Sequence, residues 1–194
     1  PRQLPGITSL PEGNRWESGL PDGFRRALQT IRNNGKLVSS TGEIEIEPAR
    51  RRIRIVTPKS EAFSLEGGTL SGNLLSGTVN DRFQTISVHS LDGRPLAESD
   101  SLLLLHVTNT AATGMRFYDR SRRMLESWGK LPLLVERGRA ELSLRHRDSA
   151  KLKIDALAWD GSVRSRIPAT VSAGTLRFTA DTANGGNMIY HIHK

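Results

Sequence analysis

The sequence contains no cysteine among its 194 residues. This excludes a disulfide-stapled scaffold, a thiolate zinc site, an iron–sulfur cluster and a cysteine nucleophile. Long apolar runs are also missing, because the longest, Leu102–Leu105, is far shorter than the roughly 18 residues that a membrane-spanning helix needs. No signal-peptide pattern is visible. The chain begins at Pro1 rather than at a methionine, and we therefore expect it to be part of a longer protein.

Basic residues outnumber acidic ones by 28 to 20, which gives a formal net charge of +8. Seven of the eight excess charges lie in residues 101–194, and 22 of the 28 basic residues are arginine. The densest basic cluster, with its two aromatic neighbours, consists of Arg116, Phe117, Tyr118, Arg120, Arg122 and Arg123. Cations interleaved with aromatic rings on one face would suit a polyanion, whereas a solvated loop carries such charges without a partner. We favour the solvated loop and expect no nucleic-acid partner.

Proline and glycine are frequent in residues 1–22, where no periodic pattern is found, and this composition is typical of a tether. Residues 22–33 then place apolar side chains at the i, i+3, i+4 and i+7 spacing of one helical face. These side chains are Phe24, Ala27, Leu28 and Ile31. Asp22 is the expected N-cap, and Gly35 suits the left-handed end of the helix. We therefore divide the chain into a tether with a short helix, residues 1–35, and a β-domain, residues 36–194.

From residue 36 onward the apolar pattern has a period of two, which indicates half-buried strands. Residues 43–47 and 52–55 alternate isoleucine with charge around Pro48-Ala49-Arg50 and predict a hairpin. Further strands are predicted at 83–91, 101–108, 133–136, 139–146, 151–159, 163–167, 175–180 and 187–193. Leu102–Leu105 is expected to form a central strand covered on both faces. About ten short strands separated by turns predict an all-β, antiparallel β-sandwich of jelly-roll or Greek-key type.

The histidines and carboxylates offer two routes to catalysis. His191 and His193 would project from one face of a strand, and with a third ligand they could chelate a metal. The alternative is a polar strand end, and we expect neither a metal nor a cofactor. A glycosidase needs two carboxylates roughly 5–10 Å apart. The spacing of the candidate acids selects no pair among Glu98, Asp100, Glu126 and Glu136, so no catalytic residue is assigned.

Aromatic residues make up only 5% of the chain, and three of them lie near predicted turns. An exposed aromatic ring can stack on the apolar face of a sugar. Trp128, Trp159 and Tyr118 are therefore the candidate carbohydrate-binding residues. The alternative for each tryptophan is a position in the core or at a seam, because tryptophan is mostly buried.

Several phrases in the sequence, taken in their order and spacing, resemble the C-terminal β-domains of large bacterial glycoside hydrolase-like proteins. The resemblance covers residues 36–192, and the phrases are Gly42–Ile46, Arg54–Ala62, Val88–Leu96, Asn109–Met115, Trp128–Glu136, Ala156–Gly161, Leu176–Thr179 and Met188–Tyr190. The chain departs from the family at Val56, where an acid often precedes the Thr-Pro pair. Residues before 36 do not share the resemblance.

In that family the β-domain follows a (β/α)8 catalytic barrel, which carries the acid and the nucleophile. The resemblance therefore implies a non-catalytic accessory domain that packs against the barrel, contacts a polysaccharide or oligosaccharide as a second role, and belongs to a secreted or periplasmic protein. Two alternatives stay open. One is a free-standing β-sandwich hydrolase acting on carbohydrate, and the other is a basic module that binds polyanions or nucleic acid.

Overall fold

The computed structural model describes residues 19, 21–119, 122–183 and 185–194. Most of the predicted tether, residues 1–18 and 20, lies outside this part, as do the apolar side chains on which the helix prediction rested. Helix α1 spans Asp22–Asn34 and ends at Gly35, whose φ of +60° is the predicted left-handed conformation. Asp22 is not the N-cap. Pro21 holds that position, and Asp22 instead pairs with Arg25 across the first turn at 2.6 Å.

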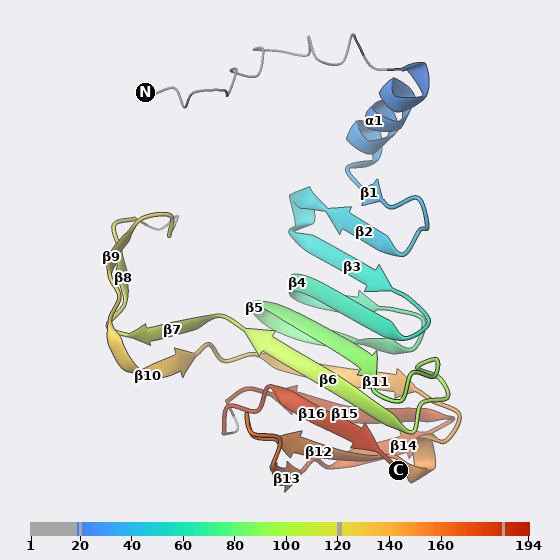
Figure 1. Ribbon diagram of the computed structural model, residues 1–194, viewed down its shortest axis with the longest axis vertical. Helices are drawn as coiled ribbons and strands as arrows, with labels where there is room; N and C mark the ends of the chain where they lie inside the picture. The colour runs from blue at the N-terminus through green and yellow to red at the C-terminus, as the bar shows by residue number, and fades with distance from the viewer. Residues whose placement is uncertain (1–18, 20, 120–121, 184) are drawn as a thin grey trace.

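The body of the molecule is all-β, as predicted, and is built on one antiparallel sheet of twelve strands (Figure 1). Its strands are β1 (Leu37–Val38), β2 (Ile44–Glu47), β3 (Arg52–Val56), β4 (Ser60–Ser71), β5 (Leu75–Ser90), β6 (Ser101–Thr108), β11 (Arg139–Arg145), β12 (Lys153–Leu157), β13 (Val163–Arg166), β14 (Ala169–Ser172), β15 (Thr175–Asp181) and β16 (Ile189–His193). Two 3-10 turns, η2 (Pro48–Arg50) and η3 (Ser149–Lys151), complete the body. None of the helices in the described ranges has the length and apolarity to cross a membrane.

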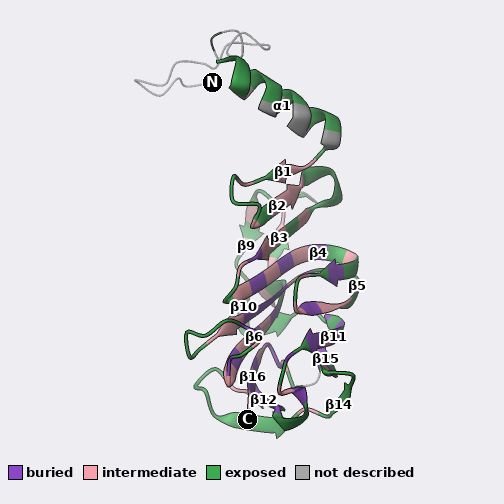
Figure 2. Ribbon diagram, turned by 90° about the vertical axis from the view of Figure 1, so that its right-hand side faces the viewer, coloured by how far each residue is buried: buried purple, intermediate pink, exposed green. Residues whose placement is uncertain are grey.

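The sheet divides into two branches at the long strand β5. The second half of β5 continues into β6, β16, β12 and β13, whereas its first half pairs with β11, which leads to β15 and β14. Alternate residues of both branches point into a single hydrophobic cluster. Leu102 and Ile192 come from one branch, and Leu142 and Leu176 from the other. Figure 2 shows this burial concentrated in the body, while the described side chains of α1 are exposed.

A bulge between β4 and β5 marks the point of division. The register jumps between the pairs Glu66–Phe83 and Gly68–Val79, which leaves residues 80–82 as the bulge. Gly67 faces this bulge with φ of +71°, and a Cβ atom there would lie only 2.6 Å from Asp81 Oδ1. Gly67 and Gly68, both with positive φ, therefore lie inside a strand at a point where glycine tolerates the geometry best.

A buried polar network supports the bulge from the core side. The Gln84 amide donates to the backbone oxygen and side chain of Asn80, at 3.1 and 2.8 Å. Its carbonyl therefore faces His106, 2.6 Å from Nε2, which must carry the ring proton. The other ring nitrogen, Nδ1, is buried and has no partner among the described residues. Burial lowers the pKa of His106 to about 4, so the ring is neutral at pH 7.

The tight turn between β4 and β5 is held by Glu61, which is fully buried. Its Oε1 accepts hydrogen bonds from the backbone N–H groups of Asn73 and Leu74, and its Oε2 accepts one from Leu75, all at 2.9 Å. A Cβ atom at Gly72 would collide with this carboxylate. Glu61 therefore has a structural role, in which it satisfies three backbone donors of the turn.

Residues 110–119 and 122–135 project from the end of β6 as two short ribbons, which we call the arm (Figure 1). The first ribbon joins β7 (Thr110–Thr113) to β10 (Lys130–Val135), and the second joins β8 (Arg116–Phe117) to β9 (Leu125–Ser127). Arg137-Gly138 does not connect β10 and β11 as a hairpin. Instead Gly138 crosses close to β6, where a Cβ atom would lie 2.5 Å from Thr108 Cγ2.

Candidate functional site

The outer face of β4, β5, β6, β16, β12 and β13 carries three of the five histidines, and we call it the histidine face. Antiparallel partners project to the same side of a sheet, so the register defines its rows. One row crosses six strands and consists of Ser60, His89, Leu103, His191, Asp155 and Arg166. His193 and Ser101 form part of the next row. His191 and His193 therefore share one face, as predicted, with ring centroids 4.6 Å apart.

Serine hydroxyl groups of the same face form hydrogen bonds with ring nitrogens of two of these histidines. His89 Nδ1 lies 2.6 Å from Ser60 Oγ, and its Nε2 lies 2.9 Å from Ser87 Oγ. His191 Nε2 lies 2.8 Å from Ser101 Oγ. Burial lowers the pKa of His89, and burial together with the neighbouring His193 lowers that of His191. Both rings are therefore neutral members of a hydrogen-bonded surface at pH 7.

Asp155 is the buried anion of the histidine face. Its Oδ2 accepts a hydrogen bond from His193 Nε2 at 2.9 Å, and both its oxygens face the Arg166 guanidinium. These bonds lower the pKa of Asp155 despite its burial. Asp155 is thus bound by His193 and Arg166 rather than by His191, so within the described part of the chain no acid extends the Ser101–His191 pair into a serine–histidine–acid relay.

The described ranges contain no group of three or more histidine, aspartate or glutamate side chains placed to hold a metal ion. His191 and His193 remain a pair without a third ligand in that part of the chain. The stacked rings agree with the predicted side-chain direction of a His-x-His strand, but they do not by themselves form a coordination site.

Apolar side chains fill the rest of the histidine face. Leu103, Leu105, Leu157 and Ile189 point outward and are only half-buried, since they pack sideways against one another. Leu102 and Leu104 point inward and are fully buried. The expectation that the leucine run is covered on both faces is therefore wrong for the outer face. This surface is partly apolar and internally hydrogen-bonded.

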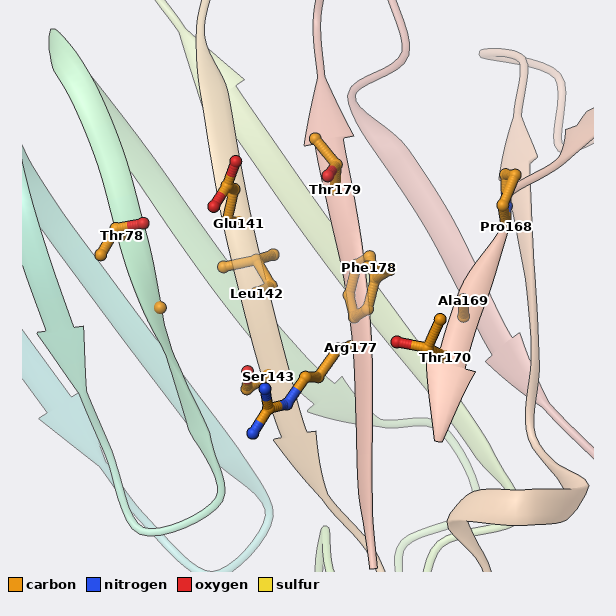
Figure 3. A pocket seen from close by; sticks show the side chains of 11 residues that line it. Thr78, Glu141, Leu142, Ser143, Pro168, Ala169, Thr170, Arg177, Phe178 and Thr179 are labelled. Atoms are coloured by element: carbon orange, nitrogen blue, oxygen red, sulfur yellow. The ribbon is translucent and has the colours of Figure 1, made fainter. Parts of the chain in front are cut away.

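A groove of about 550 Å³ lies on the opposite branch, over β11, β15 and β14 (Figure 3). Hydroxyl groups of Thr78, Ser143 and Thr170 line it, together with the charged side chains of Glu141 and Arg177. Phe178 also contributes, but it is mostly buried in the core. Glu141 is the single carboxylate of the groove lining, so this groove lacks the acid pair of a glycosidase.

A second cleft, of about 480 Å³, lies where the arm leaves the body. Phe83 and Val107 form its apolar part. The charged side chains that line it are Arg51, Glu66, Asp81, Arg82, Arg122 and Glu136. Two ion pairs cross it, Arg51–Glu66 at 2.6 Å and Arg82–Glu136 at 3.6 Å. Of the four acids considered from sequence, only Glu136 lines this cleft. Asp81 was not among them, because the bulge that exposes it has no sequence signature.

The three predicted carbohydrate-binding aromatics are all highly exposed, with fractions of 78% for Trp128, 75% for Trp159 and 68% for Tyr118. Their exposure excludes the alternative of a core position. Tyr118 and Trp128 belong to the arm, whereas Trp159 lies in the turn between β12 and β13. None of the three lines the groove or the cleft described above. The structure thus leaves them as separate exposed rings rather than as one platform.

The basic cluster lies at the far end of the arm. Arg120 is outside the described residues. Arg116 pairs with Glu126 at 3.4 Å, and the Arg122 guanidinium lies 5.2 Å from the centre of the Phe117 ring.

Comparison with family models, with characterised proteins and with solved structures found no match for this chain.

Proposed function

We propose that this chain is a non-catalytic accessory domain of a glycoside hydrolase-like protein. Its two branches form the layers of a β-sandwich, and its histidine face packs against a catalytic (β/α)8 barrel of the same longer protein. Contact with carbohydrate through exposed aromatic rings is a second role. The resemblance in the sequence suggests the parent protein, and the organisation of the histidine face supports the docking role.

The supporting observation is that polar groups of the histidine face are already hydrogen-bonded to one another. Burying a polar group costs little when its hydrogen bonds are made, and a great deal when they are not. His89, His191 and Asp155 all have partners on the face itself. A protein surface can therefore cover this face, bury its leucines and leave few donors or acceptors unpaired. An active site would instead need free groups that converge on a substrate.

The docking role is tested by labelling histidines with diethyl pyrocarbonate in the 194-residue chain and in the parent protein. We expect His89, His191 and His193 to react several-fold more slowly in the parent, because the barrel covers them. His106 is the internal control, since it is fully buried and should stay unreactive in both proteins. Equal labelling of the three face histidines in both proteins, or glycosidase activity from the 194-residue chain alone, would overturn the proposal.

The carbohydrate role is tested on a glycan array with the wild-type chain and with Trp128→Ala, Trp159→Ala and Tyr118→Ala. Loss of a stacked ring should weaken binding about tenfold or more if that ring holds a sugar. Val171→Ala, on the exposed strand β14, is the matched control and should bind like wild type. An array without any signal for the wild-type chain would remove this role and leave the docking role in place.

A free-standing hydrolase is the second candidate, and the cleft at the base of the arm favours it. Glu66, Asp81 and Glu136 all line that cleft, which is large enough for a sugar unit. Hydrolysis by this site requires that Asp81→Asn or Glu136→Gln abolish an activity shown by the wild-type chain on a polysaccharide. The proposal of a non-catalytic domain predicts that there is no such activity to abolish.

A further inference from the structure

The arm exposes several large apolar side chains. On β10, Leu131 is 78% exposed, Leu133 63% and Leu134 53%. Successive residues of a strand point to opposite faces, so the exposure of both Leu133 and Leu134 means that neither face of this ribbon is covered. Met124 and Trp128, which flank strand β9 of the second ribbon, are also highly exposed.

Without a partner, such a ribbon would leave the apolar side chains of both its faces in contact with water. β7 and β10 pair only with each other among the described strands, and so do β8 and β9. An isolated two-stranded ribbon is marginally stable, and contiguous exposed apolar side chains are typical of surfaces that bind another protein. The arm therefore has the composition of an element that is completed by a partner.

The charges of the arm indicate what kind of surface that partner offers. Residues 110–135 carry five basic and two acidic side chains. Arg123 and Lys130 make no ion pair with the described residues, and the Arg122 guanidinium lies over the Phe117 ring. A second copy of this chain, at a net charge of +8, would repel the arm, whereas a surface with carboxylates would attract it.

We infer that the arm is a clasp that binds an apolar trough rimmed by carboxylates on the neighbouring catalytic domain. This inference rests on the proposed function, because it takes the partner from there. It adds a second contact, separate from the histidine face, in which β10 supplies the apolar anchors and Arg123 and Lys130 supply the charges.

The clasp is tested by amide hydrogen exchange on the full-length parent protein. We expect the amides of β7 and β10 to exchange at least about tenfold more slowly in the wild type than in the double variant Leu131→Asp/Leu133→Asp. Arg123→Glu combined with Lys130→Glu should give a similar loss of protection. Val171→Asp is the matched control, because it adds the same charge on another exposed strand and should leave the arm unchanged.

The outcomes separate this inference from the proposed function. Fast exchange in the wild-type arm, with the face histidines shielded from labelling, would overturn the clasp and leave the docking role standing. A protected arm with fully reactive face histidines would support the clasp and overturn the histidine face as the docking surface. Protection that rises with protein concentration would show that a second copy covers the arm, and would also overturn the clasp.

Discussion

The buried carboxylate of Glu61 gives the sharpest test of how this fold is held together. Glu61→Gln keeps the size and shape of the side chain but replaces one carboxylate oxygen by an amide group. With the remaining oxygen facing Asn73 and Leu74, the new NH2 group points at the Leu75 N–H, which is itself a donor. The substitution therefore removes one acceptor and leaves a buried backbone donor without a partner.

The expected loss follows from the number and kind of these bonds. A hydrogen bond to a charged group contributes about 1.5–3 kcal/mol, and an unsatisfied buried donor costs about 1–3 kcal/mol. These two effects overlap, so we expect the free energy of unfolding to fall by about 3 kcal/mol. For a chain of this length that corresponds to a decrease in Tm of roughly 6–12 °C.

The measurement is urea unfolding followed by far-ultraviolet circular dichroism, with the m-value compared between variants. Glu66→Gln is the matched control, because Glu66 lies on the same strand and pairs with Arg51 at the surface. Exposed pairs of this kind contribute less than about 1 kcal/mol. A loss below 1 kcal/mol for Glu61→Gln, or one equal to that of the control, would refute the structural role of the buried carboxylate.

Three further substitutions probe the core by the same urea titration. Gly72→Ala should cost about 2 kcal/mol or more, because its methyl group collides with the Glu61 carboxylate; an unchanged midpoint would contradict the turn geometry. Tyr190→Phe should cost about 1 kcal/mol, because the hydroxyl makes two hydrogen bonds with the backbone, and burial raises the pKa of Tyr190 to about 12. His106 has a pKa of about 4 in the folded chain against 6.5 ordinarily, so stability should fall by about 2 kcal/mol between pH 7 and pH 5 as the unfolded chain takes up the proton. His106→Gln should remove this contribution and leave a smaller dependence, because the pKa values of His89 and His191 are also lowered; an unaltered slope would contradict the buried neutral ring.

The sequence pattern was informative wherever alternation was regular. The predicted hairpin at residues 43–55 is β2 and β3, with Ile44 opposite Ile55 and Ile46 opposite Ile53. Strand β4 was missed because its inward row begins with Glu61, and a charged residue at a core position hides the period of two. The first half of β5 was missed because the bulge at residues 80–82 interrupts the alternation.

The candidate surfaces depend on the register of strands that are far apart in the chain. His89 and His191 are about a hundred residues apart in the chain, yet they share one row of the histidine face, with Leu103 between them. Nothing local in the sequence specifies that register. The exposure of Trp128 and Trp159 could not be predicted either, because a tryptophan near a turn is compatible with both a core and a surface position. The partner of β10 also could not be predicted, since Arg137-Gly138 has the composition of a hairpin turn.

Strand β5 has a consequence for how the molecule comes apart. Residues 75–79 are bonded to β4 and β11, and residues 84–90 to β4 and β6, so one continuous segment belongs to both branches of the sheet. Neither branch can open without disrupting backbone bonds that hold the other. The body should therefore unfold in one cooperative step, whereas the arm, whose strands bond only among themselves, can melt without disturbing it.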